Sequence, residues 1–526
     1  MTASADADVT CAVFRRLPPA ALAPDAVHRF VVGEDTAPRR LTAEEASREL
    51  GDPFAVLLLL RGVFPRTGGE VLAALDRAGS EADALGRQMI FLVGEGSQIP
   101  FSPDTASVQR NLRFLVTRGS GPEGPDVLLS SFHPDEGDVE LMAWDRRSGG
   151  FNFYRTVGAN SAWVFAGNSR HALVDPTQGK GPFESHQSGN VLMKELRAPW
   201  IHWDSPDAEV LPSVFAGDDP LREHPWFREK EPQGAFTCEV SVARPSIERW
   251  TKARFAALVA QEGTVDRPAR VMRQLLETPT VNLISSPARS RDAVAAARVE
   301  LPETFFVDAE ALKLLGLPPP RFAVEGRLYG RSLRSFQVRL TDDDGFARPG
   351  DTHFAFVVPE RAFEDHAVLA EAVRVGLISH RLAACLLMTD FPNPVFSTRR
   401  AALLRHVPAT ATIQGGQSSF SVEMAEAILA AAEGSAADSA EREFAERWAV
   451  GDAWREEFGR LLGAYFRAVD GKLKTQEGFD AYYRLAESRR DQVRRLPIFE
   501  SPLLFARTNI PSATRVMRRD GTVIEA

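Results

Sequence analysis

The chain has 526 residues, of which 44% are hydrophobic, 25% charged and 9% aromatic; this is close to the globular average and unlike disordered or fibrous proteins. Its 71 acidic residues outnumber 62 basic ones, giving a net charge of -9, and the basic residues form no stripe, so we expect no nucleic-acid partner. The length predicts roughly two to four domains or one large fold with insertions.

The cysteines and the apolar segments indicate the compartment. Cys11, Cys238 and Cys385 lie far apart and outside any CxxC spacing, which predicts neither a disulfide framework nor a cysteine zinc site. The N-terminus lacks a signal-peptide pattern, and the longest apolar run, at 54–60, is far too short to span a bilayer. We therefore expect a cytoplasmic, bacterial-type protein without a membrane partner, and the sequence leaves its oligomeric state open.

The hydrophobic periodicity predicts an α+β fold in four successive regions. Residues 1–87 form a mixed α/β lead-in with two helices. Residues 88–240 form an antiparallel β-rich region, because six short aromatic and β-branched segments alternate with turn residues. Residues 241–358 mix helix and strand, and residues 359–526 form a helical C-terminal domain.

Four finer expectations follow from the same patterns. Residues 139–157 predict a hairpin with a glycine-containing connection. Residues 207–240, rich in Pro, Asp and Glu, predict a long irregular loop. Residues 321–358 predict a second strand-rich patch, and residues 431–443 predict a low-complexity Ala/Glu/Ser linker.

The densest chemistry lies in the window 181–206, GPFESHQSGNVLMKELRAPWIHWDSP. His, Asp and Glu in one short stretch are the residue types that a metal or haem site needs, whereas a structural core uses mainly Leu, Val and Phe. A short helix is expected within it, ending before Pro199, because proline does not continue a helix.

One hypothesis for this window is haem binding. Residues 182–186, Pro-Phe-Glu-Ser-His, have the spacing of the covalent haem motif CxxCH with both cysteines replaced. Residues 181–200 thereby resemble the haem-attachment region of cytochrome c-like modules. The resemblance implies that His186 is an axial ligand of a non-covalently bound haem. Met193 reaches the opposite haem face poorly from the same helix, so His202 or a distant residue would be the second ligand.

A second hypothesis is non-haem iron. On an extended strand His202 and Asp204 point to the same side, as two members of a 2-His-1-carboxylate triad would. Arg361 looks like the cosubstrate arginine of 2-oxoglutarate dioxygenases. The alternative is that His202 binds a backbone carbonyl and Asp204 caps a turn. Candidates for the third ligand are His353, His366 and His380.

Other residues in the same part of the chain are weaker candidates for a functional site. His171, His186 and His202 are spaced about 15 residues apart and could converge from adjacent loops on one metal. Lys194 and Glu195 could supply an acid and a base, although a Lys/Glu pair on a helix is more often a solvated face.

Three tryptophans and one arginine-containing segment are further candidates for ligand binding. Trp200, Trp203 and Trp226 could line a pocket for a planar ligand, although aromatic residues beside prolines more often pack in a core or a rigid loop. Residues 389–400 could bind an anion, although a plain helix cap is the better reading of Ser397.

The leading functional expectation is an oxidoreductase that uses iron or haem and acts on a small-molecule substrate. The expected catalytic residues are His202, Lys194 and Glu195; the expected cofactor-binding residues are His186, Trp200 and Trp203; the expected metal ligands are His186, His202, Asp204 and His171. Two alternatives stay open. One is a non-catalytic binding or assembly protein with a degenerate cytochrome-like site, and the other is a metal-free transferase or hydrolase with its site between the β-rich half and the helical domain.

Overall fold

The computed structural model describes most of the chain, and it has 47% helix and 19% strand, so the fold is α+β as predicted. The chain divides into two compact units: unit 1 is Met1–Arg254 with Pro497–Leu503, and unit 2 is Phe255–Leu496 with Leu504–Ala526. The described residues are 22–78, 85–93, 101, 103, 106, 113–119, 123–131, 134–191, 215–217, 219–231, 237–258, 263–278, 281–287, 290–341, 347–349, 355–495 and 506–526.

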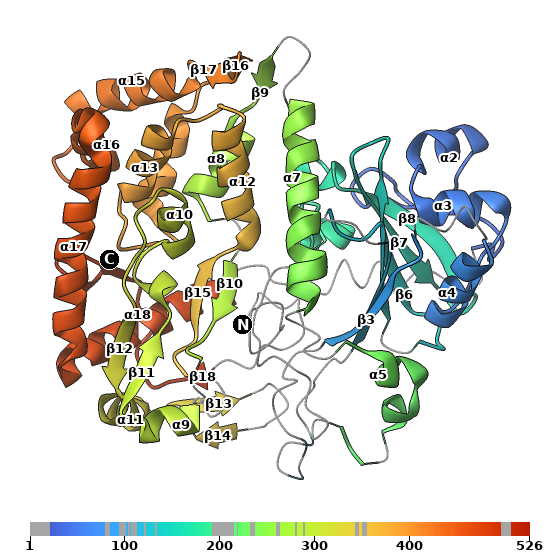
Figure 1. The fold of residues 1–526 in the computed structure, drawn as a ribbon, viewed down its shortest axis with the longest axis horizontal. Coiled ribbons are helices and arrows are strands. Elements are labelled where there is room, and N and C mark those ends of the chain that lie inside the picture. Colours follow the sequence, from blue (N-terminus) through green and yellow to red (C-terminus); the bar gives the residue numbers. More distant parts are fainter. Residues whose placement is uncertain are drawn as a thin grey trace. The chain divides into compact units, whose positions relative to one another are not determined.

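Unit 1 contains an eight-stranded sheet in the order β2-β1-β8-β7-β6-β5-β4-β3 (Figure 1). Six of its strands form an antiparallel meander: β3 (Gln88–Val93), β4 (Arg113–Arg118), β5 (Val127–Ser131), β6 (Val139–Asp145), β7 (Gly150–Val157) and β8 (Ala162–Asn168). The β6–β7 hairpin pairs Asp145 with Gly150 at its turn. Both the meander and this hairpin are confirmed.

The N-terminal segment extends this sheet and covers it. Strand β1 (His28–Arg29) runs parallel to β8, and β2 (Arg39–Arg40) pairs antiparallel with β1, so the sheet is mixed. The helices α2 (Ala43–Glu49), α3 (Pro53–Leu57) and α4 (Gly68–Arg77) lie on one side of the sheet (Figure 1).

Asp52 joins helix α3 to the sheet. Its carboxylate caps the helix at the backbone N–H of Ala55 and accepts hydrogen bonds from the Tyr154 hydroxyl (2.5 Å) and the Asn152 amide (2.8 Å). Both carboxylate oxygens of Asp52 thereby have partners in the core, and burial raises the pKa of Asp52.

The rest of unit 1 departs from the expected irregular loop at 207–240. The described part of this stretch includes two short helices, η7 (Pro220–Glu223) and α5 (Pro225–Glu229), and Pro stands at the start of each. Proline is tolerated in a first helical turn, where its missing N–H would have no intrahelical partner. A π-helical turn (Glu239–Ala243) then leads into α7 (Arg244–Leu258).

Unit 2 is mainly helical. Its helices are α8 (Ala269–Leu276), α9 (Ser290–Ala295), α10 (Ala309–Leu314), α11 (Gly326–Ser335), α12 (Phe363–Arg374), α13 (His380–Met388), α14 (Thr398–Ala402), α15 (Phe420–Glu433), α16 (Ala440–Ala449), α17 (Trp454–Leu473) and α18 (Gln476–Arg494).

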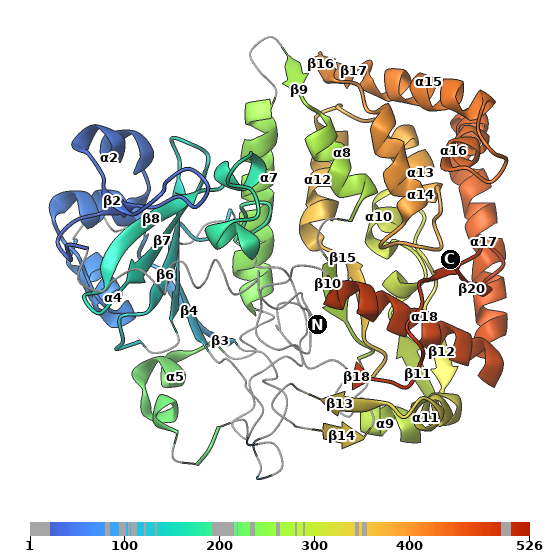
Figure 2. The same ribbon diagram turned by 180° about the vertical axis from the view of Figure 1, so that it is seen from behind.

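Small sheets connect these helices. The paired strands are β10 (Val281–Ile284) with β15 (Val358–Arg361), β11 (Arg298–Leu301) with β12 (Phe322–Glu325), β13 (Arg339–Thr341) with β14 (Ala347–Pro349) and β18 (Ala506–Arg507), β16 (Thr410–Gln414) with β9 (Thr264–Asp266) and β17 (Gln417–Ser418), and β19 (Arg515–Met517) with β20 (Val523–Glu525). Strands β19 and β20 lie beside α18 (Figure 2).

Two expectations for unit 2 are wrong in part. Residues 326–335 form helix α11 within the stretch expected to be strands, because Leu328, Tyr329, Ser332 and Leu333 recur at helical spacing and are buried against neighbouring helices. The expected linker begins inside α15, which continues to Glu433, since alanine favours the helix and Phe420, Met424 and Ile428 bury one face of it.

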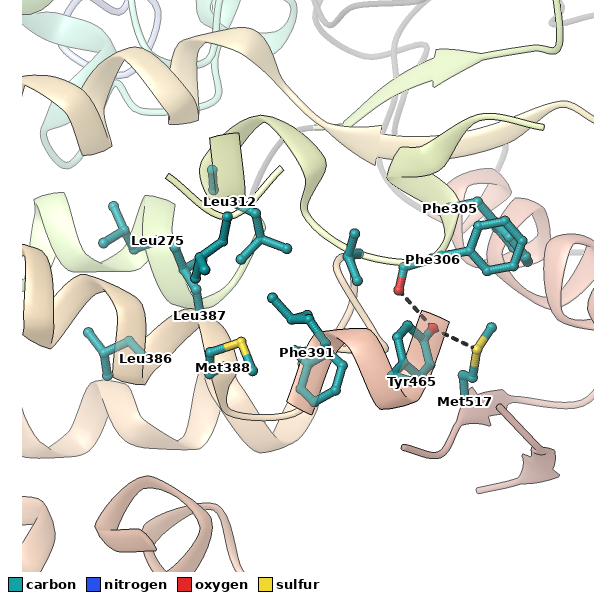
Figure 3. Close-up of a cluster of buried hydrophobic side chains, with 14 of the residues drawn as sticks. Leu275, Phe305, Phe306, Leu312, Leu386, Leu387, Met388, Phe391, Tyr465 and Met517 are labelled. Atoms are coloured by element: carbon teal, nitrogen blue, oxygen red, sulfur yellow. Dashed lines mark hydrogen bonds between the residues drawn. The ribbon is translucent and has the colours of Figure 1, made fainter. Parts of the chain in front are cut away.

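The core of unit 2 gathers aromatic and aliphatic side chains from distant segments (Figure 3). Phe306 is fully buried, and its ring centroid lies 4.4 Å from that of Phe322 and 5.5 Å from that of Tyr482. The Tyr465 hydroxyl lies 2.9 Å from both the Phe306 carbonyl oxygen and the Met517 sulfur, as the dashed lines show (Figure 3). Among the described helices, none combines the length and apolar character that crossing a membrane requires.

Candidate functional site: a buried cluster around Asp308

Most residues expected to form the site lie outside the described residues. They are Lys194, Glu195, Trp200, His202, Trp203 and Asp204, together with Met193, the helix before Pro199 and the distant candidate His353. Their predicted roles therefore stay predictions.

His186 lies in the described part of the window, in the turn that follows the 3-10 helix Gly181–Glu184. Its Nδ1 donates a hydrogen bond to the Asn190 carbonyl oxygen at 2.9 Å, which places a proton on Nδ1. Its ring packs beside Phe153, with the two ring centroids 5.3 Å apart.

His171 lies in a second 3-10 turn (His171–Leu173) and is also bonded to nearby groups. The backbone N–H of Asn168 donates to its Nδ1 at 3.0 Å, and its Nε2 faces Glu34 Oε1 at 3.7 Å. Burial lowers the pKa of His171. Within the described ranges, no group of three or more His, Cys, Asp or Glu side chains is arranged to hold a metal ion.

Unit 2 contains a cluster of ionisable side chains that the window hypothesis did not include. Helix α8 packs against α12 and α14, and α12 packs against α10. The polar residues at this junction, which we call the Asp308 cluster, are Gln274, Asp308, Arg361, Asp365, His366 and Arg400.

Asp308 is the centre of this cluster. It is the N-cap of α10, and its carboxylate accepts hydrogen bonds from Arg361 Nε (2.7 Å) and His366 Nε2 (2.8 Å). Burial opposes ionisation of Asp308, but the nearby His366 and Arg361 outweigh it and hold the pKa of this carboxyl well below its usual range. The cluster therefore keeps a buried carboxylate ionised.

This contact fixes the chemistry of His366. The ionised carboxylate only accepts, so the proton of a neutral His366 ring sits on Nε2 and the lone pair sits on Nδ1. The His366 side chain is 15% exposed, and within the described structure Nδ1 has no hydrogen-bond partner. An oriented imidazole with an available lone pair is the usual form of a general base.

Arg400 adds a second buried cation next to Arg361. Arg400 is fully buried, and its Nη2 donates to the carbonyl oxygens of Asn393 (2.9 Å) and Pro394 (2.8 Å). Burial, and then the charge of Arg361, lower the pKa of Arg400 to about 10. Arg400 Nε and Nη1 and Arg361 Nη2 are buried and find no acceptor in the described part of the chain.

The loop before α14 holds Arg400 in place. Asp390 and Phe396 have φ values of +53° and +57°, a left-handed conformation that costs a non-glycine residue about 1–3 kcal/mol. Ser397 caps α14: its Oγ accepts from the Arg400 backbone N–H (3.0 Å) and donates to Asp390 (2.6 Å). The helix-cap interpretation of Ser397 is therefore confirmed.

Sequence reasoning listed His366 and Arg361 only as distant partners of His202 and missed Asp308. Arg361 binds Asp308, and this pairing offers no support for the suggested cosubstrate role. Five ionisable residues in seven positions, at 360–366, was a signal that could have drawn attention to this segment.

Replacing Asp365 with Asn is expected to raise the free energy of unfolding at pH 7 by about 1 kcal/mol. Burial, and then Glu364, outweigh Arg361 and raise the pKa of Asp365 well above its usual value. An acid whose pKa is raised on folding contributes its full stability below its unfolded pKa, and this contribution is lost as the pH rises. An Asn side chain avoids that loss and still accepts the hydrogen bond from Gln274 Nε2 (3.1 Å).

Urea unfolding of both proteins at pH 5 and pH 8 measures this effect. The stability advantage of the Asp365→Asn variant should widen as the pH rises. A variant that is less stable than the wild type at both pH values would contradict the raised pKa.

A scan against protein-family models, a search of curated proteins and a search of solved structures each found no match to this chain.

Proposed function

We propose that unit 2 carries a general-base site and that the protein is a hydrolase or transferase acting on a small ester. The observation that supports this proposal is the Asp308 carboxylate, which binds His366 Nε2 on one oxygen and Arg361 Nε on the other. This arrangement leaves the Nδ1 lone pair of a partly exposed imidazole for a substrate or a water molecule.

Each residue of the proposed site has a defined role in the reaction. His366 Nδ1 takes the proton from a water or substrate hydroxyl as its oxygen attacks the ester carbonyl. The new C–O bond forms, the bond to the leaving group breaks, and the leaving oxygen takes that proton back from the imidazolium. Asp308 fixes the tautomer and stabilises the transient imidazolium, and the hydrogen-bonded Arg361 contributes to keeping Asp308 ionised.

Replacing His366 with Gln is expected to reduce hydrolysis of p-nitrophenyl acetate by about 100-fold, the typical contribution of a general base. The amide can occupy the space of the ring and bind Asp308, but it has no basic nitrogen. Release of p-nitrophenolate at pH 7 measures the rate. Circular dichroism of the variant shows whether it has folded.

His406 offers a matched control. Its Nε2 lies 3.1 Å from a Glu441 carboxylate oxygen and its side chain is 12% exposed, but it is not part of the Asp308 cluster. The His406→Gln variant should keep the wild-type rate. If the wild type releases no p-nitrophenolate beyond buffer, or if His366→Gln equals the wild type, the proposed function is wrong.

The iron- or haem-dependent oxidoreductase stays a prediction. Most of its candidate ligands lie outside the described residues, and the described ones, His171 and His186, are each bonded to groups of unit 1. Metal analysis and an absorption spectrum of the purified protein decide this question. A cytoplasmic location also stays a proposal; it is supported by Cys238 and Cys385, which are buried free thiols.

A further inference from the structure

A second group of charges in unit 2 lies around Glu443, apart from the base His366. Three arginines from different segments converge on this carboxylate: Arg399 of α14, Arg447 one turn along α16 from Glu443, and Arg519 in the turn between β19 and β20. Helix α14 packs against α16, which brings the first two together. We call these four residues the Glu443 site.

Only two of the three arginines lie within hydrogen-bond distance of the Glu443 carboxylate. Its Oε1 accepts from the Asp390 backbone N–H (3.1 Å) and forms an ion pair with Arg519 Nη2 (2.5 Å). Its Oε2 accepts from Arg399 Nη2 (2.9 Å). Arg447 Nη2 is 3.8 Å from Oε1, which is beyond hydrogen-bond distance.

Arg447 therefore has buried N–H groups without hydrogen-bond acceptors in the described structure. Its side chain is 7% exposed, and its Nε and Nη2 are buried without a hydrogen-bond acceptor among the residues that the structure describes. Arg399 Nε is likewise buried without an acceptor among the described residues. Burial, and then the like charge of Arg519, lower the pKa of Arg447. Buried guanidinium N–H groups normally have acceptors, so these N–H groups can donate to the oxygens of a bound anion.

The charges around Glu443 and the exposure of two of its arginines also bear on ligand binding. Three guanidinium groups face the Glu443 carboxylate, and Glu446 lies close enough to Arg447 to offset part of its charge. The side chains of Arg399 and Arg519 are 42% and 46% exposed, so they border solvent and can move to admit an ion. The N–H fork of arginine matches the oxygens of a phosphate group.

We propose that the Glu443 site binds a phosphate group, with Arg447 and Arg399 as its buried donors and Arg519 as its outer contact. The group is either free phosphate or the phosphate of a monoester. This inference is independent of the ester chemistry proposed for His366, because it rests on other residues.

Isothermal titration calorimetry of the full chain with inorganic phosphate and with phenyl phosphate, at constant ionic strength set with chloride, tests the proposal. Saturable binding of at least one of the two is expected. The Arg519→Ala and Arg399→Ala variants should each bind about tenfold or more weakly, since each loses a charge-assisted contact. Both side chains are partly exposed, so both variants should fold.

Arg442 is the matched control on the same helix, because it is exposed and donates to the carbonyl oxygens of Ser435 and Glu433. The Arg442→Ala variant should bind like the wild type. Tighter binding of phosphate than of phenyl phosphate identifies the free ion as the ligand, and the reverse order identifies a monoester. Absence of binding by both, or equal binding by the wild type, Arg519→Ala and Arg399→Ala, would overturn the proposal.

Discussion

Replacing Asp308 with Asn is expected to lower the free energy of unfolding by about 3–5 kcal/mol, the usual cost of removing one partner of a buried ion pair. The change leaves the Arg361 guanidinium buried without its carboxylate, since Arg361 Nε donates to Asp308 at 2.7 Å. The amide oxygen of Asn can still cap α10, so the cap is preserved and the charge is the main loss. Urea unfolding at pH 7 measures the difference.

The pH dependence of this stability difference shows whether the loss of the carboxylate charge is its cause. The pKa of Asp308 is depressed in the folded protein, so its contribution is complete above the unfolded pKa and is lost as the pH falls through the folded pKa. The difference between wild type and Asp308→Asn should therefore shrink under acid conditions, below about pH 4.

A double variant separates the effect of the uncompensated charge on stability from the effect of lost packing contacts. Asp308→Asn combined with Arg361→Met removes both charges and should recover part of the stability lost in Asp308→Asn alone, because an apolar replacement leaves no uncompensated cation. A double variant that loses the sum of the two single effects would show that the ion pair is not the source of the stability.

Replacing Phe306 with Ala is expected to lower the free energy of unfolding by about 3–5 kcal/mol, the range for deleting a buried aromatic ring. Phe306 is fully buried and packs against Phe305, Phe322 and Tyr482, so neighbours from several segments would lose contacts at once. Thermal and urea unfolding measure the loss. Hydrogen exchange with mass spectrometry should locate it in unit 2.

Leu314 serves as the control for this substitution. It lies at the end of α10 and is 44% exposed, so Leu314→Ala should change stability by no more than about 0.5 kcal/mol. An effect of Leu314→Ala as large as that of Phe306→Ala would show that the loss of stability does not depend on burial of the side chain in the core.

The fold of unit 1 could be predicted from the sequence because its pairing is local. Each strand of the meander pairs with the next one along the chain, and glycine-containing turns mark the connections, as at 146–150. Strand β1 was missed, because a two-residue strand that pairs in parallel with β8 leaves no alternating pattern. Helix α11 was mistaken for strand, since Tyr329 and Leu333, four positions apart, share a face in a strand as well as in a helix.

The Asp308 cluster could not be predicted from spacing. Asp308 and His366 are 58 positions apart, and Gln274 and Asp365 are 91 apart, so tertiary packing brings them together. Spacing in the sequence reveals only residues that are close together along the chain, such as His202 and Asp204, and these lie in one window. A buried charge pair has no local signature unless both partners lie on one element.

The position of β19 in the sequence affects when unit 2 can complete its folding during translation. Asn393 binds the backbone of Met517 through both its amide atoms, donating to the carbonyl oxygen at 3.0 Å and accepting from the N–H at 2.9 Å, across 124 positions. Met517 is buried in the core of unit 2. While residues 506–526 are still inside the ribosome, the loop that holds Arg400 and the core beside Tyr465 lack these partners. Unit 2 therefore acquires its final packing only after translation has passed its last strand, whereas the meander of unit 1 has all of its strands hundreds of residues earlier.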